Sequence, residues 1–228
     1  TRKESSAASD VYKRQVAGCT ALLLIGFGIQ DSILPIVDKQ SRQLTHNDLT
    51  ISLSDEKALT MEQGLADTLD SSSAVRSWGA FYTKSTTLYN EEGGSADVSI
   101  VGAEDDARMT EYFTFRTRVG HDPIPFEEDS VILTEKTALN LELSVGDTFY
   151  VEAADGSRVP LVLTGITENY MFTRLYLSNA QLQALLGSTP EWNTVYGLTG
   201  CTTEAEYNAL RTKLLGCNYV SSVSFTED

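Results

Sequence analysis

The stretch that most constrains the fold runs from Ser130 to Ser178, where strand, turn and hairpin signals follow one another closely. It opens on the apolar run Val131–Leu133, and Thr134 then offers a hydroxyl that we expect to cap a short helical turn. Further on, Phe149–Ala153 alternates as a strand does, and Asp155-Gly156 is a strong signal for a tight hairpin. The stretch therefore predicts a small β-rich unit within a larger chain.

The second arm of this hairpin is expected to be one strand from Val159 to Ile166. Its apolar residues Val159, Leu161 and Leu163 fall on one face, because successive side chains in a strand point to opposite sides. The apolar run Leu175–Leu177 is expected to close the unit as another strand.

The order of motifs along this stretch adds information that no single motif carries. An apolar strand is followed by Thr-Glu-Lys at 134–136, Val-Gly-Asp at 145–147, the hairpin, Leu-Thr-Gly-Ile-Thr-Glu-Asn-Tyr at 163–170 and Tyr-Leu-Ser at 176–178. In this order and spacing the sequence resembles the extracytoplasmic domain of FtsX/MacB-like permeases of ABC transporters. The apolar run that starts at Val16 is similar to the end of that family's first membrane helix, so the resemblance covers residues 16–228.

That apolar run is the candidate membrane segment. Val16–Ile29 is 14 residues without a charge, which alone is short for a span, and continuing to Val37 gives 22 residues with one charge, Asp31. At ~1.5 Å per residue such a helix reaches roughly 33 Å, enough for the hydrocarbon layer. A secretory signal peptide is the alternative, although Gly26-Phe27-Gly28 is a poor cleavage site.

Two β-α-β patterns flank the β-rich unit, and the first of them precedes it. Asp48–Leu53 alternates as a half-buried strand, with Leu49, Ile51 and Leu53 on one face. Thr60–Gln63 has the pattern of a capping box that opens a helix, and Val75–Leu88 follows as a strand.

The second β-α-β pattern follows the unit. Capping boxes at Ser178–Gln181 and Thr203–Glu206 are expected to open helices, and the strands are expected at Thr194–Thr199 and Tyr219–Phe225. Neither pattern closes a core alone, because two short strands under one helix leave apolar surface and strand edges exposed. The strands at Asp48–Leu53 and Tyr219–Phe225 are therefore predicted to share one sheet.

These elements predict an α+β fold: an N-terminal transmembrane helix, then a split ferredoxin-like subdomain of two β-α-β halves with an inserted β-rich subdomain. In the resembled family these are the porter-like and Sabre-like subdomains. The expected division is a non-native or disordered scar at 1–15, the transmembrane helix at 16–37, a stalk at 38–46, porter-like halves at 47–95 and 179–228, and the inserted Sabre-like subdomain at 96–178.

The charge of the chain excludes one class of partner. The formal net charge is −15, and the acidic excess lies after residue 43, where 28 acidic side chains accompany 11 basic ones. Such a surface repels nucleic-acid phosphates, so no nucleic-acid partner is expected. A well-solvated domain surface accounts for the acidic residues.

The sequence offers no recognisable reaction chemistry, and no catalytic, cofactor-binding or metal-ligating residue is expected. His46 and His121 lie in polar loop sequence and are expected to be solvated. The run Glu127-Glu128-Asp129 lacks the ligand spacing of a calcium loop. There is no nucleotide phosphate loop, and no motif of the common hydrolases. The chain is therefore not expected to be an enzyme.

The remaining candidate side chains are expected to serve packing. We interpret the scattered aromatics Phe113, Phe115, Tyr170 and Phe172 as core residues rather than as the walls of a ligand groove. The three cysteines, Cys19, Cys201 and Cys217, are too few for a disulfide scaffold and are interpreted as small buried hydrophobes.

The resemblance implies a permease fragment located in the cell membrane, with the residues after about 38 outside the cytoplasm. Its implied partners are a separate ABC ATPase subunit, the lipid membrane and a second permease in a dimer. The outer domain would couple cytoplasmic ATP hydrolysis to extracytoplasmic work, either export or mechanotransmission, with an unidentified cargo or outer partner. The alternative is a secreted, non-enzymatic binding protein with an N-terminal signal peptide, and a secreted hydrolase is the weakest hypothesis.

Cys201 and Cys217 are predicted not to form a disulfide, even in an oxidising compartment. They flank a predicted helix, Glu204–Leu215, whose 12 residues rise ~18 Å at ~1.5 Å each. A disulfide requires Cα atoms ~4.4–6.8 Å apart. Peptide mass spectrometry under non-reducing conditions measures this directly, and a linked Cys201–Cys217 peptide would show that the helix is misplaced.

Overall fold

The computed structural model describes residues 16–22, 39–153 and 155–226, without the side chains of residues 41 and 42. The chain divides into two compact units, Thr1–Lys39 and Gln40–Asp228. In the first unit, residues 16–22 are helical. None of the helices in the described part of the chain has the length and apolar character that a membrane crossing requires. Most of the span expected at 16–37, and the whole segment 1–15, lie outside the described residues.

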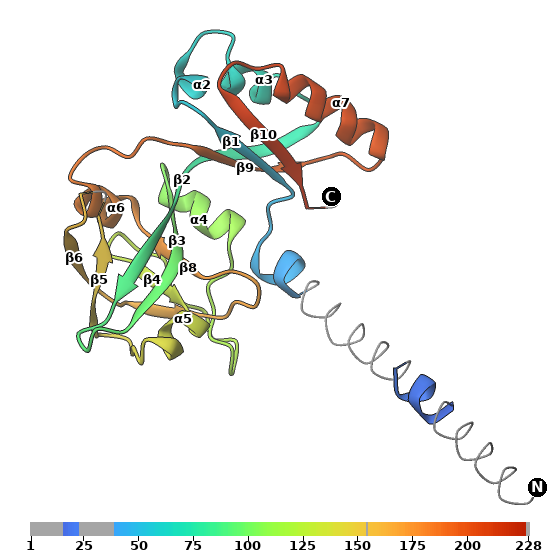
Figure 1. Ribbon diagram of the computed structural model, residues 1–228. Helices are drawn as coiled ribbons and strands as arrows, with labels where there is room; N and C mark the ends of the chain where they lie inside the picture. Colours follow the sequence, from blue (N-terminus) through green and yellow to red (C-terminus); the bar gives the residue numbers. More distant parts are fainter. Residues whose placement is uncertain (1–15, 23–38, 154, 227–228) are drawn as a thin grey trace, which may run out of the picture. The chain divides into compact units, whose positions relative to one another are not determined.

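The second unit combines one large sheet with short helices, so the α+β class is confirmed (Figure 1). The strands are β1 (Leu49–Leu53), β2 (Val75–Tyr89), β3 (Ser95–Ala103), β4 (Val131–Thr134), β5 (Thr148–Glu152), β6 (Arg158–Val162), β7 (Gly165–Thr167), β8 (Arg174–Leu177), β9 (Thr194–Thr199) and β10 (Val220–Phe225). The helical elements are the π-type turn η1 (Gln40–Leu44), α2 (Lys57–Thr60), α3 (Leu65–Asp70), α4 (Asp106–Tyr112), α5 (Glu135–Asn140), α6 (Asn179–Leu186) and α7 (Glu204–Leu215).

The described strands form one sheet in the order β10-β1-β9-β2-β3-β8-β4-β7, and β5 pairs with both β2 and β6. The predicted pairing of distant segments is confirmed, because β1 and β10 are antiparallel neighbours with Leu49 opposite Phe225. All neighbours in the part β10-β1-β9-β2 are antiparallel, whereas β3 and β8 are parallel.

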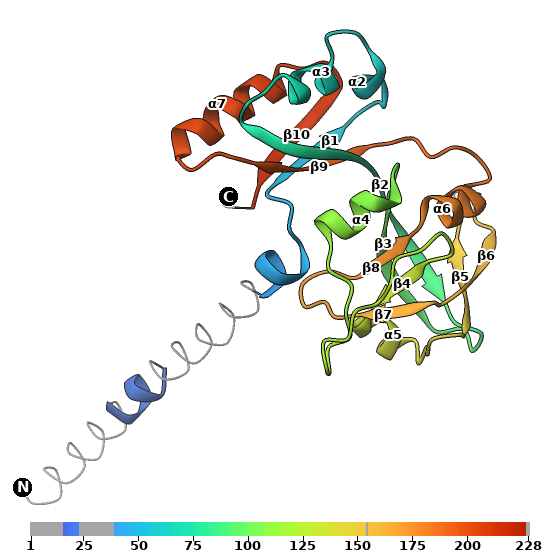
Figure 2. The same ribbon diagram turned by 180° about the vertical axis from the view of Figure 1, so that it is seen from behind.

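The first lobe consists of β10, β1, β9 and the start of β2 with α2, α3 and α7. Figures 1 and 2 both show α3 and α7 over the same side of these strands. Burial alternates strictly along β1, so the side chains of Leu49, Ile51 and Leu53 enter the core between the sheet and the helices. That core includes Leu49, Ile51, Leu65, Leu69, Val195, Leu210 and Leu214.

The inserted lobe consists of the second half of β2 with β3–β8, α5 and α6. Its core lies on the same face of the sheet that carries the first core, since Tyr82, Val98 and Ile100 point into it. Helices α5 and α6 add Ala138, Leu182 and Leu185. Strand β2 is 15 residues long and takes part in both lobes, pairing with β9 near its start and with β3 and β5 further on.

Two of the predicted helix starts are confirmed in detail. The Ser178 side chain accepts a hydrogen bond from the Gln181 N–H, and α6 ends at Gly187 with φ of 67°, the left-handed conformation that glycine adopts freely. Thr203 and Glu206 form a complete capping box at the start of α7. The helix Glu204–Leu215 is found at its predicted bounds.

The capping box predicted at Thr60 is wrong. Thr60 ends α2, and α3 begins only at Leu65, with Gly64 as its N-cap residue. The Asp67 carboxylate accepts a hydrogen bond of 2.7 Å from the Gln63 N–H, so it satisfies a backbone donor before the helix starts. A Cβ atom at Gly64 would lie 2.6 Å from the Met61 Cγ, and only glycine allows the chain to turn so tightly here.

Two further expectations require correction. Thr134 precedes α5, but its hydroxyl makes no capping bond and instead contacts the Thr137 hydroxyl at 3.2 Å. The single strand expected at Val159–Ile166 is two strands, β6 and β7, because β6 pairs with β5 whereas β7 pairs with β4. Within the segment 38–46, expected to be a stalk, Gln40 and Leu44 are buried.

We expect Ile51→Ala to lower the free energy of unfolding by about 2–5 kcal/mol, because the substitution empties a fully buried position between β1 and the helices. The matched control is Ser52→Ala on the next residue of the same strand, which faces away from this core. It should change stability by no more than about 0.5 kcal/mol. Urea unfolding of both variants measures the difference, and equal losses would contradict the assignment of the two faces.

Candidate functional site

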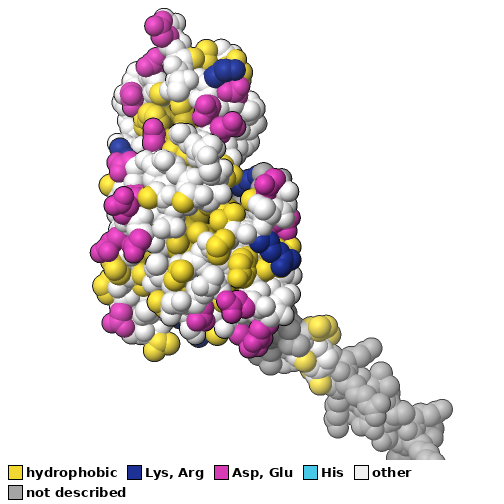
Figure 3. All heavy atoms as spheres, turned by 90° about the vertical axis from the view of Figure 1, so that its left-hand side faces the viewer, with side chains coloured by type: hydrophobic (Ala, Val, Ile, Leu, Met, Phe, Trp, Pro, Cys, Tyr) yellow, Lys and Arg dark blue, Asp and Glu magenta, His cyan; other side chains and the backbone are white. Residues whose placement is uncertain are grey.

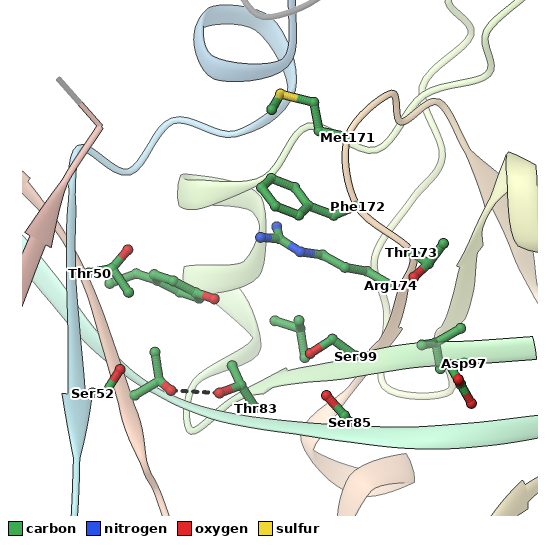
Figure 4. A pocket seen from close by; sticks show the side chains of 14 residues that line it. Thr50, Ser52, Thr83, Ser85, Asp97, Ser99, Met171, Phe172, Thr173 and Arg174 are labelled. Carbon is green, nitrogen blue, oxygen red and sulfur yellow. Dashed lines mark hydrogen bonds between the residues drawn. The ribbon is translucent and has the colours of Figure 1, made fainter. Parts of the chain in front are cut away.

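The strongest candidate for a functional site is a groove on the other face of the sheet, where both lobes contribute to the floor (Figure 4). Its volume is about 440 Å³. Hydroxyl side chains from four neighbouring strands share this floor: Thr50 and Ser52 of β1, Thr194 of β9, Thr83 and Ser85 of β2, and Ser99 of β3. The groove is therefore lined by many uncharged hydrogen-bonding groups, together with two charged side chains, Asp97 and Arg174.

The register of the strands explains why these hydroxyls lie together. Thr50 is opposite Tyr196, Ser52 is opposite Thr194, and Ser85 is opposite Ser99. Residues directly opposite each other in a sheet point to the same face. One cross-strand hydrogen bond, 2.7 Å between the Thr83 and Thr194 hydroxyls, connects the strands across the groove floor.

The remainder of this face is covered by an aromatic cluster under α4. Phe81 contacts Tyr112, Phe113 and Tyr196 with ring centroids 4.7–6.2 Å apart, mostly in edge-to-face geometry. Phe113 and Phe115 are buried in this cluster, so their interpretation as core residues is confirmed. The groove occupies the part of the face that the cluster leaves open.

Phe172 does not belong to the core, and its interpretation as a core residue is wrong. Its side chain is 48% exposed and that of the preceding Met171 is 51% exposed, and both line the groove. The Asn169 side chain accepts hydrogen bonds from the backbone N–H groups of both residues. This turn before β8 thus holds two apolar side chains at the rim of the groove.

Arg174 lies directly beneath Phe172, and its side chain extends across the groove (Figure 4). Its guanidinium carbon is 4.6 Å from the Phe172 ring centroid and 5.5 Å from that of Phe113. Burial alone would lower the pKa of Arg174, but the Tyr176 and Tyr196 hydroxyls raise the pKa above its ordinary value. Burial also raises the pKa of Tyr196, which stays protonated at neutral pH. Arg174 is therefore a permanent cation.

A second polar cluster surrounds the buried Glu168, which follows β7. The Arg116 Nε atom donates to the Glu168 carboxylate at 2.7 Å, and the Tyr170 hydroxyl donates to the other oxygen of the same carboxylate. His121 is exposed and its Nε2 atom is 3.9 Å from Glu168. This cluster differs from the groove because its charges are paired.

The same cluster holds the first segment of the second unit, Gln40–Asp228. Gln43 of η1 accepts a hydrogen bond from Arg116, and the Gln40 side chain accepts one of 3.0 Å from the Tyr170 N–H. The Leu44 carbonyl accepts a bond from the Thr114 N–H. The chain thus enters the unit along the inserted lobe before it reaches β1.

The other candidate residues do not gather into a site. His46 is half-buried rather than solvated, with 2.7 Å between its Nε2 atom and the Thr114 hydroxyl, and burial lowers its pKa. Cys19 is exposed and Cys201 and Cys217 are half-buried, so only the latter two pack against a core. Among the described residues, no group of three or more histidine, cysteine or carboxylate side chains is placed to hold a metal ion.

Acidic side chains are spread over the surface that surrounds these sites. On the face drawn in Figure 3, Asp and Glu are distributed over the second unit, Gln40–Asp228, whereas Lys and Arg occur in few places. A cation such as Arg174 in an acidic domain is consequently a local feature rather than part of a basic patch.

Comparison with solved structures finds similar folds among outer domains of transporters. The extracellular domain of the noncanonic ABC-type transporter YknZ from Gram-positive bacteria is 14% identical, with a TM-score of 0.46, over 79% of this chain and 99% of that chain. The periplasmic region of MacB from Actinobacillus actinomycetemcomitans is 13% identical, with a TM-score of 0.47, over 84% of this chain and 94% of that chain. No protein-family model and no curated protein matches the chain. With TM-scores below 0.5, these likenesses do not establish its family.

We expect Glu168→Gln to lower the free energy of unfolding by roughly 3 kcal/mol, because the substitution leaves the mostly buried Arg116 without its counter-charge. The control is Glu135→Gln, which removes the partner of the half-exposed Arg118 and should cost at most about 1 kcal/mol. Chemical denaturation of both variants gives the two values. Equal losses would show that the buried pair contributes no more than an exposed one.

Proposed function

We propose that this chain is a fragment of an ABC transporter permease, comprising the first membrane helix at about 16–37 and the extracytoplasmic domain that follows. One observation carries the proposal beyond the sequence resemblance. The end of β10 lies beside the start of β1, because the Thr226 N–H donates a hydrogen bond of 3.0 Å to the Asp48 carbonyl. The Thr226 hydroxyl also donates to the Asn47 carbonyl at 3.0 Å.

This closure suits a domain inserted between two membrane helices. Such a domain needs its two connecting segments to start close together, since both must reach the same membrane surface. Figures 1 and 2 both show the end of β10 beside the segment that leads into β1. A free-standing secreted domain has no such requirement, although many domains have neighbouring termini.

The arrangement of the first lobe supports a split ferredoxin-like subdomain. Its two β-α-β halves contribute β1, β2, β9 and β10, all antiparallel to their neighbours, and the helices α3 and α7 share one core. Under this proposal, the porter-like halves are 47–95 and 179–228, and the Sabre-like insert is 96–178. Strand β2 then belongs to the first porter-like half and pairs with β3 and β5 of the insert.

The contacts of η1 suggest how the domain would couple to the membrane. A displacement of the chain before Gln40 would act on the inserted lobe, because η1 is bonded to Tyr170 and Arg116. A displacement after Thr226 would act on the first lobe through β10. The two membrane attachments would therefore act on different lobes, and a shift between them would bend the shared sheet.

The remaining features of the proposal concern partners and location. ATP hydrolysis would take place on a separate ATPase subunit, and the permease would work as a dimer in the cell membrane with the residues after about 38 outside the cytoplasm. No catalytic role is proposed for this chain. Its outer domain would transmit the motion to a cargo or to an outer partner.

Expressed in bacteria, the full chain should stay in the membrane fraction after an alkaline wash, with an intact mass that includes residues 16–37. The physical reason is that 22 residues with one charge are long enough to cross the hydrocarbon layer. As a control, a variant without residues 1–38 should be soluble and folded, because it keeps Gln40 and its buried hydrogen bonds. Membrane fractionation measures where each protein is found, and mass spectrometry measures whether residues 16–37 are retained.

Recovery of the full chain in the extracytoplasmic fluid with its apolar segment removed would contradict the permease proposal. That outcome would favour the secreted binding protein with a signal peptide.

A further inference from the structure

Arg174 is the feature of the groove that calls for a ligand. Among the described residues, no carboxylate lies within ion-pair distance of it, whereas Arg108, Arg116 and Arg118 each contact a glutamate at 2.6–2.7 Å. Its Nη1 atom is shielded from solvent and has no hydrogen-bond partner. The guanidinium contacts the Tyr176 hydroxyl, but it has no counter-charge, and leaving the Nη1 donor of a buried cation unsatisfied is costly. The site is therefore suited to an incoming anion.

The neighbours of Arg174 specify what kind of anion fits. A guanidinium presents a planar pair of N–H groups that matches a carboxylate in bidentate fashion. Met171 and Phe172 present apolar surface directly beside it, about half of which is exposed. A ligand with a carboxylate next to an apolar group would therefore satisfy both features at once.

The hydroxyl floor indicates an extended polypeptide rather than a compact small molecule. Its hydroxyls come from four neighbouring strands that lie ~4.7–4.9 Å apart, so the floor extends over roughly 14 Å across the sheet. A peptide that crosses these strands would find hydroxyl partners for its backbone N–H and C=O groups along this length.

We propose that the groove binds an extended segment of a partner protein in which an Asp or Glu side chain adjoins an apolar residue. The carboxylate pairs with Arg174, the apolar side chain packs on Met171 and Phe172, and the backbone lies over the hydroxyl floor. The half-exposed Phe172 ring moves outward to admit the carboxylate to the shielded Nη1 atom. This inference goes beyond the proposed function, because the groove lies within Gln40–Asp228 whether or not the chain is anchored in a membrane.

The experiment is selection from a phage-displayed library of random dodecapeptides on the purified full chain in detergent. The enriched peptides should share an acidic residue next to an apolar one. Synthetic copies with amidated C-termini should bind the chain, and exchanging their Asp or Glu for Asn or Gln should weaken binding at least tenfold. Arg174→Met should weaken binding of the acidic peptides by the same factor.

Two controls separate binding from folding. Arg118→Met removes an exposed arginine outside the groove that is paired with Glu135, and it should leave peptide affinity unchanged. Arg174→Met should unfold thermally at the same temperature as the parent or higher, because methionine fills the space without an unsatisfied donor. A lower unfolding temperature would instead assign Arg174 a structural role as the stacking partner of Phe113 and Phe172.

Several results would overturn the inference. They are the absence of enriched peptides, enrichment without acidic residues, and equal affinity of the parent and Arg174→Met for the selected peptides. A change in sedimentation of Arg174→Met would show that a second copy of the chain covers the groove. These outcomes are independent of membrane retention, so the failure of this inference and that of the proposed function are distinguishable.

Discussion

The hydrogen bonding of strand β2 is the constraint on which the rest of the second unit, Gln40–Asp228, depends. Its first half pairs with β9 and its second half with β3 and β5, so the backbone of one strand carries the sheet through both lobes. Because side chains alternate along a strand, the register of β2 fixes both faces together. A slip of one residue would move Tyr82 out of the inserted core and Thr83 into it, and would disperse the groove.

Sequence patterns that span only a few residues predicted much of this fold, because strand alternation and helix capping have local physical causes. The alternation of Leu49 and Ile51 with Thr50 marks one buried and one open face of β1, and the structure uses both. Thr203 caps α7 through a residue three positions away. Thr60 shows the limit of such reasoning, since its box pattern is present but α2 ends at Thr60 and α3 begins only after the turn at Gly64.

The candidate sites could not be predicted in the same way, because they depend on contacts between distant segments. Arg116 and Glu168 are 52 residues apart, and Gln40 is 130 residues from Tyr170. Phe172 looks like any scattered aromatic in the sequence, and only the turn at Asn169 places it at the groove rim. Alternation along each strand can place Thr50, Thr83 and Ser99 away from the core. Only the order of the strands in the sheet shows that their hydroxyls share one floor.

The position of the groove and the path of the chain are physically connected, because both involve the two lobes. The floor draws Thr50 and Ser52 from the first lobe, and Ser99 and Arg174 from the inserted lobe. A ligand that touches both lobes favours the relative position in which all contacts are made, by as much as its affinity differs between positions. The connection is reciprocal, so a force that η1 and β10 apply to different lobes would shift the relative position of the lobes and thereby change the affinity of the groove. A force from the membrane attachments and the binding of a ligand would then both act on the bending of one sheet, and β2 is the strand that carries this bending between the lobes.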